Sequence, residues 1–145
     1  MWFKPRYHAR KTEGIPALLP LCFDLPLRLN QANYGARQKE LNEHGIYNQA
    51  RCRVRGWELH EEDTARVQSS TDPEIVLKHL PKRIFVEMER KTYPQYQNMP
   101  DHQVPLPPTT TIWHLDRDEH MRIPRRGFAC IPDFSSTIHN ATGRT

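Results

Sequence analysis

Apolar and polar residues alternate along several short stretches of this chain, which is the pattern of β-strands that bury one face. Leucine or phenylalanine occupies every second position from Leu19 to Leu29. In residues 50–57, small or apolar residues alternate with arginines, so Arg51, Arg53 and Arg55 share one face. The predicted strands are residues 19–29, 50–57, 82–88, 109–115 and 122–131.

Prolines and polar runs mark the connections between these strands. Two prolines in residues 19–29 predict an edge strand or two short strands joined at a break. Residues 30–45 end in Gly45 and predict a loop or a short helix with a glycine stop. The segment 58–71 is acidic and predicts a solvated loop, and the five prolines of residues 90–108 predict a long loop. Asp72-Pro73-Glu74 is typical of a helix start, so a short helix is expected to end near Pro81.

Length and composition narrow the fold class. A chain of 145 residues suits one domain of ordinary size, and 37% apolar residues allow only a modest core. Thirteen prolines argue against long helices. The expected fold is mainly β with little helix, either a small β-barrel or an α+β fragment.

Charge, cysteine and histidine content limit the classes of function. A net charge of +4 permits nucleic acid as a partner without demanding it. The three cysteines lie far apart, which favours reduced thiols of an intracellular protein in which they are small core residues. The eight histidines show no ligand spacing, so no metal site is expected. No apolar run is long enough for a membrane span, so no membrane partner is expected.

Two arginine sets and the end of the chain offer candidate chemistry. Arg51, Arg53 and Arg55 would either follow a phosphate backbone or protect an edge strand, and the same choice holds for Arg122, Arg125 and Arg126. Trp57 and Trp113 would stack bases or, as we favour, belong to the core. Residues 134–145 combine hydroxyls, an imidazole and a Gly-x-Thr turn, a combination suited to phosphate.

Three segments resemble the Pif-type and RecD-like DNA helicases of superfamily 1B. Residues 25–30 are similar to an apolar strand of that family, and residues 45–57 are similar to its asparagine-glycine hairpin. Residues 133–145 are similar to helicase motif V, and the order of the three segments also agrees. Gln49 stands where the hairpin has glycine, so this position is expected to have positive φ at a cost of about 1 kcal/mol.

The resemblance implies a fold and a division of the chain. It implies a small SH3-like β-barrel inserted in a partial second RecA-like domain. Residues 1–17 would be an irregular basic segment, residues 18–118 the barrel with long loops, and residues 119–145 the truncated start of the RecA-like domain. The chain would then be a fragment that lacks the N-terminal motor domain.

The same resemblance implies site residues near DNA and nucleotide. The DNA-binding candidates are Thr137, His139, Asn140, Arg51, Arg53 and Arg55. Gly143 and Arg144 would lie near the nucleotide phosphates, and Asn140 replaces a lysine of the family motif.

The resemblance implies single-stranded DNA or DNA junctions as partners and the nucleus or the mitochondrion as location. ATP and magnesium belong to the full-length family, but this chain lacks the Gly-x-x-x-x-Gly-Lys-Ser/Thr loop, the tandem-acid strand and the final arginine motif. No catalytic residue and no cofactor are therefore expected in this chain alone. Two other readings remain open, namely a stand-alone nucleic-acid-binding barrel and a basic structural subunit of a larger assembly.

Overall fold

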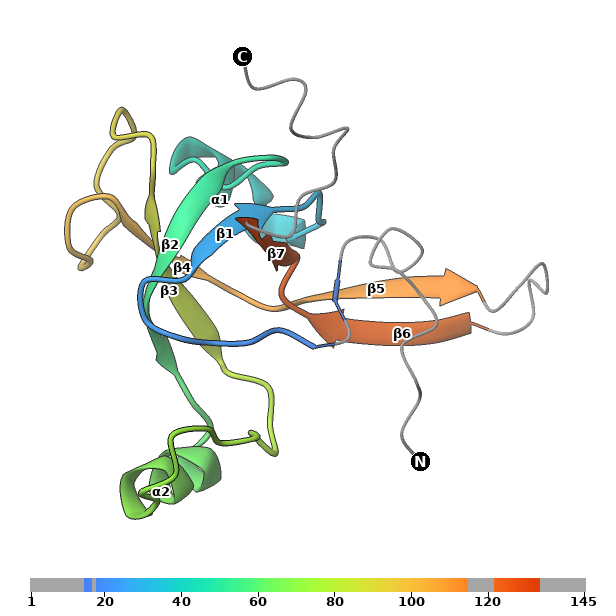
Figure 1. Cartoon of the computed structure of the whole chain (residues 1–145). Coiled ribbons are helices and arrows are strands. Elements are labelled where there is room, and N and C mark those ends of the chain that lie inside the picture. The colour runs from blue at the N-terminus through green and yellow to red at the C-terminus, as the bar shows by residue number, and fades with distance from the viewer. Residues whose placement is uncertain (1–14, 17, 115–121, 134–145) are drawn as a thin grey trace.

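A five-stranded antiparallel sheet forms the body of the molecule (Figure 1). The computed structural model describes residues 15–16, 18–114 and 122–133. The strands are β1 (Pro26–Leu29), β2 (Arg51–Glu58), β3 (Arg83–Met88), β4 (Gln103–Leu106) and β7 (Cys130–Pro132). The first four pair in chain order, and β7 returns to pair with β1, which gives the order β4-β3-β2-β1-β7.

A two-stranded ribbon of β5 (Thr109–His114) and β6 (Arg122–Gly127) projects from this body in Figure 1. An isolated pair of strands is only marginally stable in water, so the ribbon must pack against other residues of the chain. Ile15 supplies part of this packing: its backbone oxygen accepts a hydrogen bond from Arg125 Nη1 at 3.3 Å. Its side chain lies so close to Gly127 that a Cβ there would be 2.6 Å away.

The core lies on one face of the five-stranded sheet. Cys52 and Val54 of β2 face Met88 and Val86 of β3 in register, and all four side chains are buried. Leu41 from the short helix α1 (Gln38–Glu43) is also fully buried in this cluster. Each such apolar side chain contributes about 1.5–3 kcal/mol when fully buried, so the alternation along β2 and β3 accounts for much of the stability.

A second helix, α2 (Glu61–Ser69), follows β2 and lies below the sheet in Figure 1. His60 begins it, because its Nδ1 accepts a hydrogen bond from the backbone N–H of Glu62 at 3.3 Å. Acidic side chains fill the first turn, where the helix dipole favours negative charge. One of them, Asp63, is fully buried and accepts hydrogen bonds from the backbone N–H groups of Lys78 and His79 at 3.0 and 2.8 Å. Asp63 therefore ties the segment after the helix to its first turn.

Acid should loosen this segment before the sheet. Burial alone would raise the pKa of Asp63, but the N–H groups of Lys78 and His79 and the Arg66 guanidinium outweigh it and lower that pKa. Hydrogen bonds from Lys78 and His79 lower the pKa of Glu62 to about 2. Carboxylates with a lowered pKa stabilise the fold fully above their unfolded pKa near 4, and this stability is lost as the pH falls through the folded pKa.

We therefore expect the amide NMR signals of Lys78 and His79 to leave their folded positions as the pH falls below about 4, ahead of those in β3. In an Asp63→Asn variant, these two signals should already be displaced at neutral pH. Signals of Lys78 and His79 that move only together with those of β3 as the pH falls would contradict the role given to Asp63.

Comparison with the sequence confirms the mainly β class with little helix. The strands predicted over residues 50–57, 82–88 and 109–115 are present as β2, β3 and β5, although position 115 itself lies outside the described residues. The prediction for residues 30–45 is confirmed as well, since α1 ends just before Gly45.

Other strand predictions need correction. Only Pro26–Leu29 of the stretch 19–29 is a strand, because Asp24 takes a positive φ of 67° and turns the chain. Residues 103–106 of the predicted long loop form β4, an edge strand that accommodates Pro105. The single strand predicted over 122–131 is two strands in different sheets. The expected boundary between residues 118 and 119 lies outside the described residues and stays a prediction.

The two predictions for residues 58–81 were reversed. The acidic segment contains helix α2, because acids in a first turn favour the helix. The segment that begins with Asp72 has no regular structure up to Pro81, because its backbone N–H groups at Lys78 and His79 bind Asp63 instead. The cysteine prediction holds for Cys52 and Cys130, which are buried, but Cys22 is exposed.

Candidate nucleic-acid interface

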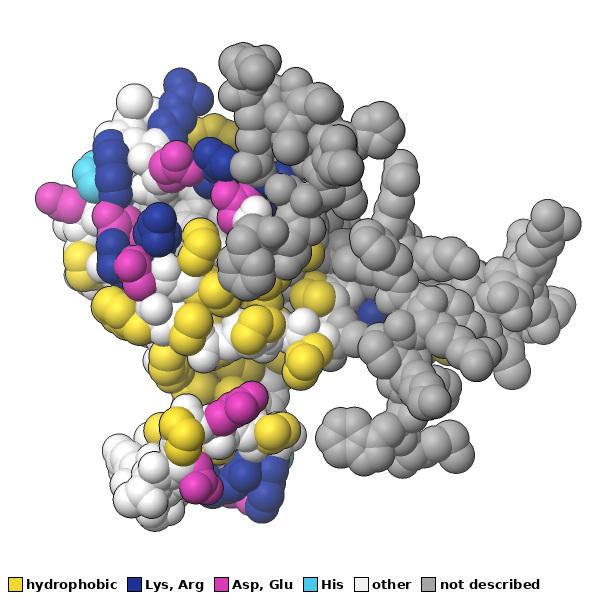
Figure 2. Space-filling model, in the orientation of Figure 1, with side chains coloured by type: hydrophobic (Ala, Val, Ile, Leu, Met, Phe, Trp, Pro, Cys, Tyr) yellow, Lys and Arg dark blue, Asp and Glu magenta, His cyan; other side chains and the backbone are white. Residues whose placement is uncertain are grey.

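The three arginines of β2 lie on the outward face of the five-stranded sheet, as the alternation predicts. The remaining candidates from the sequence lie outside the described residues, namely Thr137, His139, Asn140, Gly143 and Arg144. Figure 2 shows basic and acidic side chains interspersed over the upper left of the molecule. The charges of the arginine row must therefore be assessed together with those of the neighbouring acids.

All three arginines are engaged by acids of the protein itself, and Arg55 has the closest contacts. Arg55 Nε donates to Glu87 Oε2 at 2.5 Å, and its Nη1 lies 3.0 Å from Asp24 Oδ1. Arg53 Nη1 lies 3.8 Å from the other oxygen of Asp24. Hydrogen bonds from Lys91 and Arg55 lower the pKa of Glu87, so this acid stays ionised. A phosphate would have to compete with these carboxylates, most strongly at Arg55, which contacts two of them and is a weak candidate for the primary contact.

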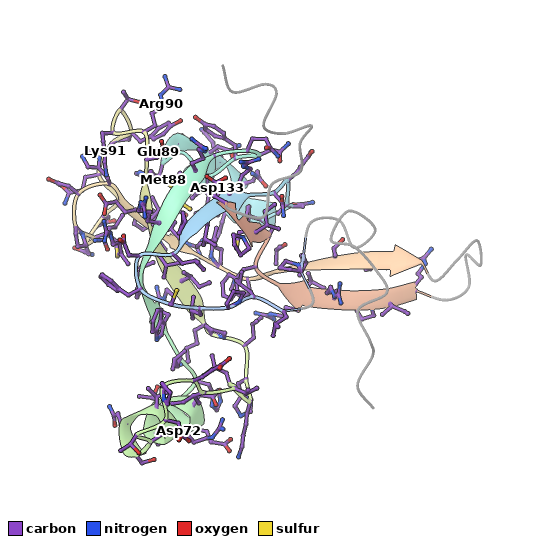
Figure 3. The ribbon with its side chains drawn as sticks, in the orientation of Figure 1. Asp72, Met88, Glu89, Arg90, Lys91 and Asp133 are labelled. Carbon is purple, nitrogen blue, oxygen red and sulfur yellow. The ribbon has the colours of Figure 1, made fainter. Side chains whose placement is uncertain are left out.

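Arg51 takes part in a bridge at the centre of the sheet. It lies directly opposite Arg28 in the register of β1 and β2, where like charges repel. Asp133, at the end of β7 in Figure 3, lies between them: its Oδ1 accepts from Arg28 Nη2 at 2.5 Å, and its Oδ2 lies 3.2 Å from Arg51 Nη2. The side chain of Arg28 is only 4% exposed, so Asp133 neutralises a buried cation. The side chain of Arg51 is partly exposed, so its guanidinium is accessible from solvent.

A hollow of about 450 Å³ opens beside Arg51, between the turn before β2 and the segment after β3. Tyr47 and Tyr93 line it with their rings edge to face, 6.0 Å apart. Arg90 also lines it, and its Cζ lies 5.9 Å from the centre of the Tyr93 ring. Figure 3 shows Arg90 at the upper end of the molecule, in the loop that follows β3. The hollow thus combines two aromatic rings with two guanidinium groups and one exposed acid, Glu89.

The turn that presents Tyr47 has a defined geometry. The N–H of Ala50 donates to the oxygen of Tyr47 at 3.1 Å, and the N–H of Gln49 donates to the oxygen of Leu29 at 2.8 Å. Gln49 has a φ of 70°, so the positive φ expected there from the sequence is present, although α1 separates this turn from β1. The first bond closes the turn and the second ties it to β1, so Tyr47 is held at the rim of the hollow.

The Tyr93 ring, which lines the hollow together with Tyr47, packs against Gly45. The N–H of Ile46 donates to Leu41 and that of Gly45 to Asn42, at 2.9 and 3.1 Å, which is the Schellman end of a helix. Gly45 takes the required positive φ of 96°. A Cβ at this position would lie 2.6 Å from Cε2 of Tyr93, so the missing side chain makes room for the ring.

The loop that carries Tyr93 is fastened to α1. The Nδ1 of His44 lies 2.9 Å from the backbone oxygen of Pro94. The hydroxyl of Tyr96 donates to Oε1 of Glu40 at 2.6 Å, and this bond lowers the pKa of Glu40. Arg37 donates to the same hydroxyl at 3.2 Å. Helix α1 and the residues that flank it therefore hold the loop of Tyr93 in place.

The β5–β6 ribbon is a second basic surface. Its two strands carry Arg122, Arg125 and Arg126 and no acid, although the connection between them contains Asp116, Asp118 and Glu119 in sequence. Among the residues that the structure describes, Arg122 and Arg126 are exposed and form no ion pair, in contrast to the arginines of β2.

Trp57 and two of the cysteines fit structural roles, whereas the side chain of Trp113 lies outside the described residues. Trp57 is partly buried and packs against the core, as favoured from the sequence. Burial raises the pKa of Cys130 to about 12 and that of Cys52 further, so both remain thiols at neutral pH. In the described ranges, no helix combines the length and hydropathy that a bilayer crossing requires.

Comparison of the chain with protein-family models, with curated proteins and with solved structures finds no match. The interface must therefore be judged on its own geometry. Sequence reasoning found Arg51 but missed Tyr47, Arg90 and Tyr93. A usable signal was present, since a tyrosine lies four residues before Arg51 and another three residues after Arg90.

Proposed function

We propose that this chain binds single-stranded nucleic acid at the hollow beside Arg51, without hydrolysing nucleotide. The observation that carries the proposal is the convergence of Tyr47, Tyr93, Arg51 and Arg90 on one solvent-open hollow. Proteins that bind single strands combine aromatic rings that stack on bases with cations that follow the backbone. This hollow offers both kinds of group within one site.

The expected binding free energy favours the hollow, which includes Arg51, over Arg53 and Arg55 of the same strand. Tyr47 is 42% exposed, so a base can stack on it without displacing a core residue. Stacking on one aromatic ring contributes about 1–3 kcal/mol per base. Arg90 has no acid partner among the described residues. Arg51 keeps Asp133 at 3.2 Å on its inner side, and toward the hollow it meets Glu89 at 3.7 Å, whose side chain is 63% exposed. An exposed ion pair is worth about 0–1 kcal/mol, so a phosphate can replace Glu89 at low cost.

We further propose that the chain is part of a larger motor of the Pif-type and RecD-like helicase class. The strand order is compatible with this: four strands form a meander, and the last strand pairs with the first, in an antiparallel sheet whose edges are β4 and β7. In such a protein, ATP and magnesium would be bound by the other motor domain together with the RecA-like part. DNA or a DNA junction would be the substrate, in the nucleus or the mitochondrion.

The stand-alone nucleic-acid-binding barrel remains a second candidate, and the ribbon favours it. Arg122 and Arg126 are exposed on a projecting two-stranded element and have no ion pair with the residues that the structure describes. Two-stranded ribbons of this kind can enter the major groove of a duplex. A preference for double-stranded over single-stranded DNA, abolished by Arg122→Gln with Arg126→Gln, would support this candidate against the hollow.

The experiment is a fluorescence-anisotropy titration of a labelled oligothymidylate with the full chain. Tyr47→Ala should weaken binding about 5-fold to 150-fold, since one stacked base is lost. Affinity should also fall with salt by about 0.7 log units per decade for each phosphate contacted.

Phe23→Ala is the matched control, because Phe23 is 63% exposed and carries Arg55 over its ring at 5.7 Å. It removes an exposed aromatic ring beside the arginine row, outside the hollow, and should leave affinity unchanged. Equal losses in both variants would contradict the hollow as the site.

A further inference from the structure

Three potential metal ligands converge at the start of α2, at the opposite end of β2 from the hollow. They are His60, Glu62 and His79, and one donor atom from each lies within 4.8 Å of the others. The two imidazole rings face each other with centroids 4.2 Å apart and a tilt of 32°. His79 Nε2 lies 2.9 Å from Glu62 Oε2, so the carboxylate already joins one of the rings.

The protein holds these three groups together although seventeen positions separate Glu62 from His79 in sequence. The buried carboxylate of Asp63 receives the backbone N–H of His79 at 2.8 Å, which fixes that residue against the first turn of the helix. Glu62 is the neighbour of Asp63 in that turn, and His60 is its cap. The arrangement therefore rests on a buried hydrogen bond rather than on surface side chains alone.

We propose that His60, Glu62 and His79 bind a divalent transition-metal ion of the Zn²⁺ type. Two imidazoles and one carboxylate are a donor set that zinc accepts, with water in the remaining position. All three side chains are exposed, so an ion has direct access from solvent. Binding would fasten the segment after α2 to the helix start a second time, beside the Asp63 contact.

Two features of the site oppose the metal and limit the expected affinity. His60 Nδ1 now accepts the Glu62 N–H, so a metal must displace this cap or select the other tautomer. The ammonium of Lys78 lies 2.7 Å from Glu62 Oε1 and opposes a second cation.

The test is a calorimetric titration of the full, metal-free chain with Zn²⁺ at pH 7.5. His60→Ala and His79→Ala should each weaken binding at least tenfold, whereas His44→Ala, at a histidine outside the cluster, should not. Lys78→Met should act in the opposite direction and tighten binding several-fold, because it removes the competing charge. This variant keeps the test decisive if the alanine variants fold poorly.

Two results would overturn the proposal: affinity that is the same in the native chain and in His79→Ala, or no heat of binding at millimolar Zn²⁺. Because the hollow lies at the other end of β2, the oligothymidylate titration is independent of this result.

Discussion

Asp133→Ala should lower the free energy of unfolding by about 3–5 kcal/mol, the cost of leaving a buried cation without its partner. Arg28 is only 4% exposed, and Asp133 is the acid that it contacts. Removal of that acid also leaves Arg28 directly opposite Arg51 across β1 and β2. Chemical denaturation followed by tryptophan fluorescence would measure the loss.

Glu58→Ala is the matched control. It also removes a carboxylate that bridges two cations, Lys82 and Arg83, but these side chains are about half exposed. Exposed pairs contribute about 0–1 kcal/mol, so the loss should be small. If Asp133→Ala does not fold, the double variant Arg28→Met with Asp133→Leu should fold, since an apolar pair replaces the buried charges. A loss of less than 1 kcal/mol in Asp133→Ala would contradict the bridge.

Gly45→Ala should destabilise the fold by about 2 kcal/mol or more and weaken nucleic-acid binding as well. A non-glycine residue at positive φ costs about 1–2 kcal/mol. The new Cβ would also lie 2.6 Å from the Tyr93 ring and push it out of the hollow. The double effect follows because one glycine both ends α1 and seats an aromatic wall of the site.

Gly35→Ala is the control that separates backbone strain from the clash with the Tyr93 ring. Gly35 also has positive φ, at 60°, but a Cβ there would meet nothing within 4 Å. Its substitution should cost only the backbone strain and leave binding unchanged. Equal effects of the two substitutions on stability and on binding would show that the Tyr93 contact has no importance.

The strands with the clearest alternation were predictable because their side chains decide the fold locally. In β2 and β3, the buried positions Cys52, Val54, Ile84 and Val86 follow the period of two without interruption. The alternation around β1 is equally regular in sequence, but Asp24 turns the backbone and ends the strand pattern early. No hydrophobic pattern reveals a turn that a single aspartate makes.

Long-range polar contacts were the main source of error. Asp63 looks like one acid in a solvated run, yet it is fully buried because Lys78 and His79 present their N–H groups to it. This contact explains why the helix forms before residue 70 rather than after Asp72. These hydrogen bonds join residues fifteen or more positions apart, so the local composition around Asp63 cannot predict them.

The candidate site was predictable only in part for the same reason. Arg51 was found because it belongs to a strand pattern. Tyr47 and Tyr93 belong to a turn and a proline-rich loop, and only the end of α1 at Gly45 brings them together. The acids that engage Arg53 and Arg55 also come from other strands and loops, so their pairing is visible only in the fold.

The most direct test of the account is an NMR titration of the full chain with oligothymidylate at low salt. Binding at the hollow predicts that the largest shifts fall on the amides of Tyr47, Gln49, Arg51, Arg90 and Tyr93. The amides of β5 and β6 should move little. Shifts concentrated on the ribbon, or no shifts at millimolar oligonucleotide, would contradict a single-strand site at the hollow.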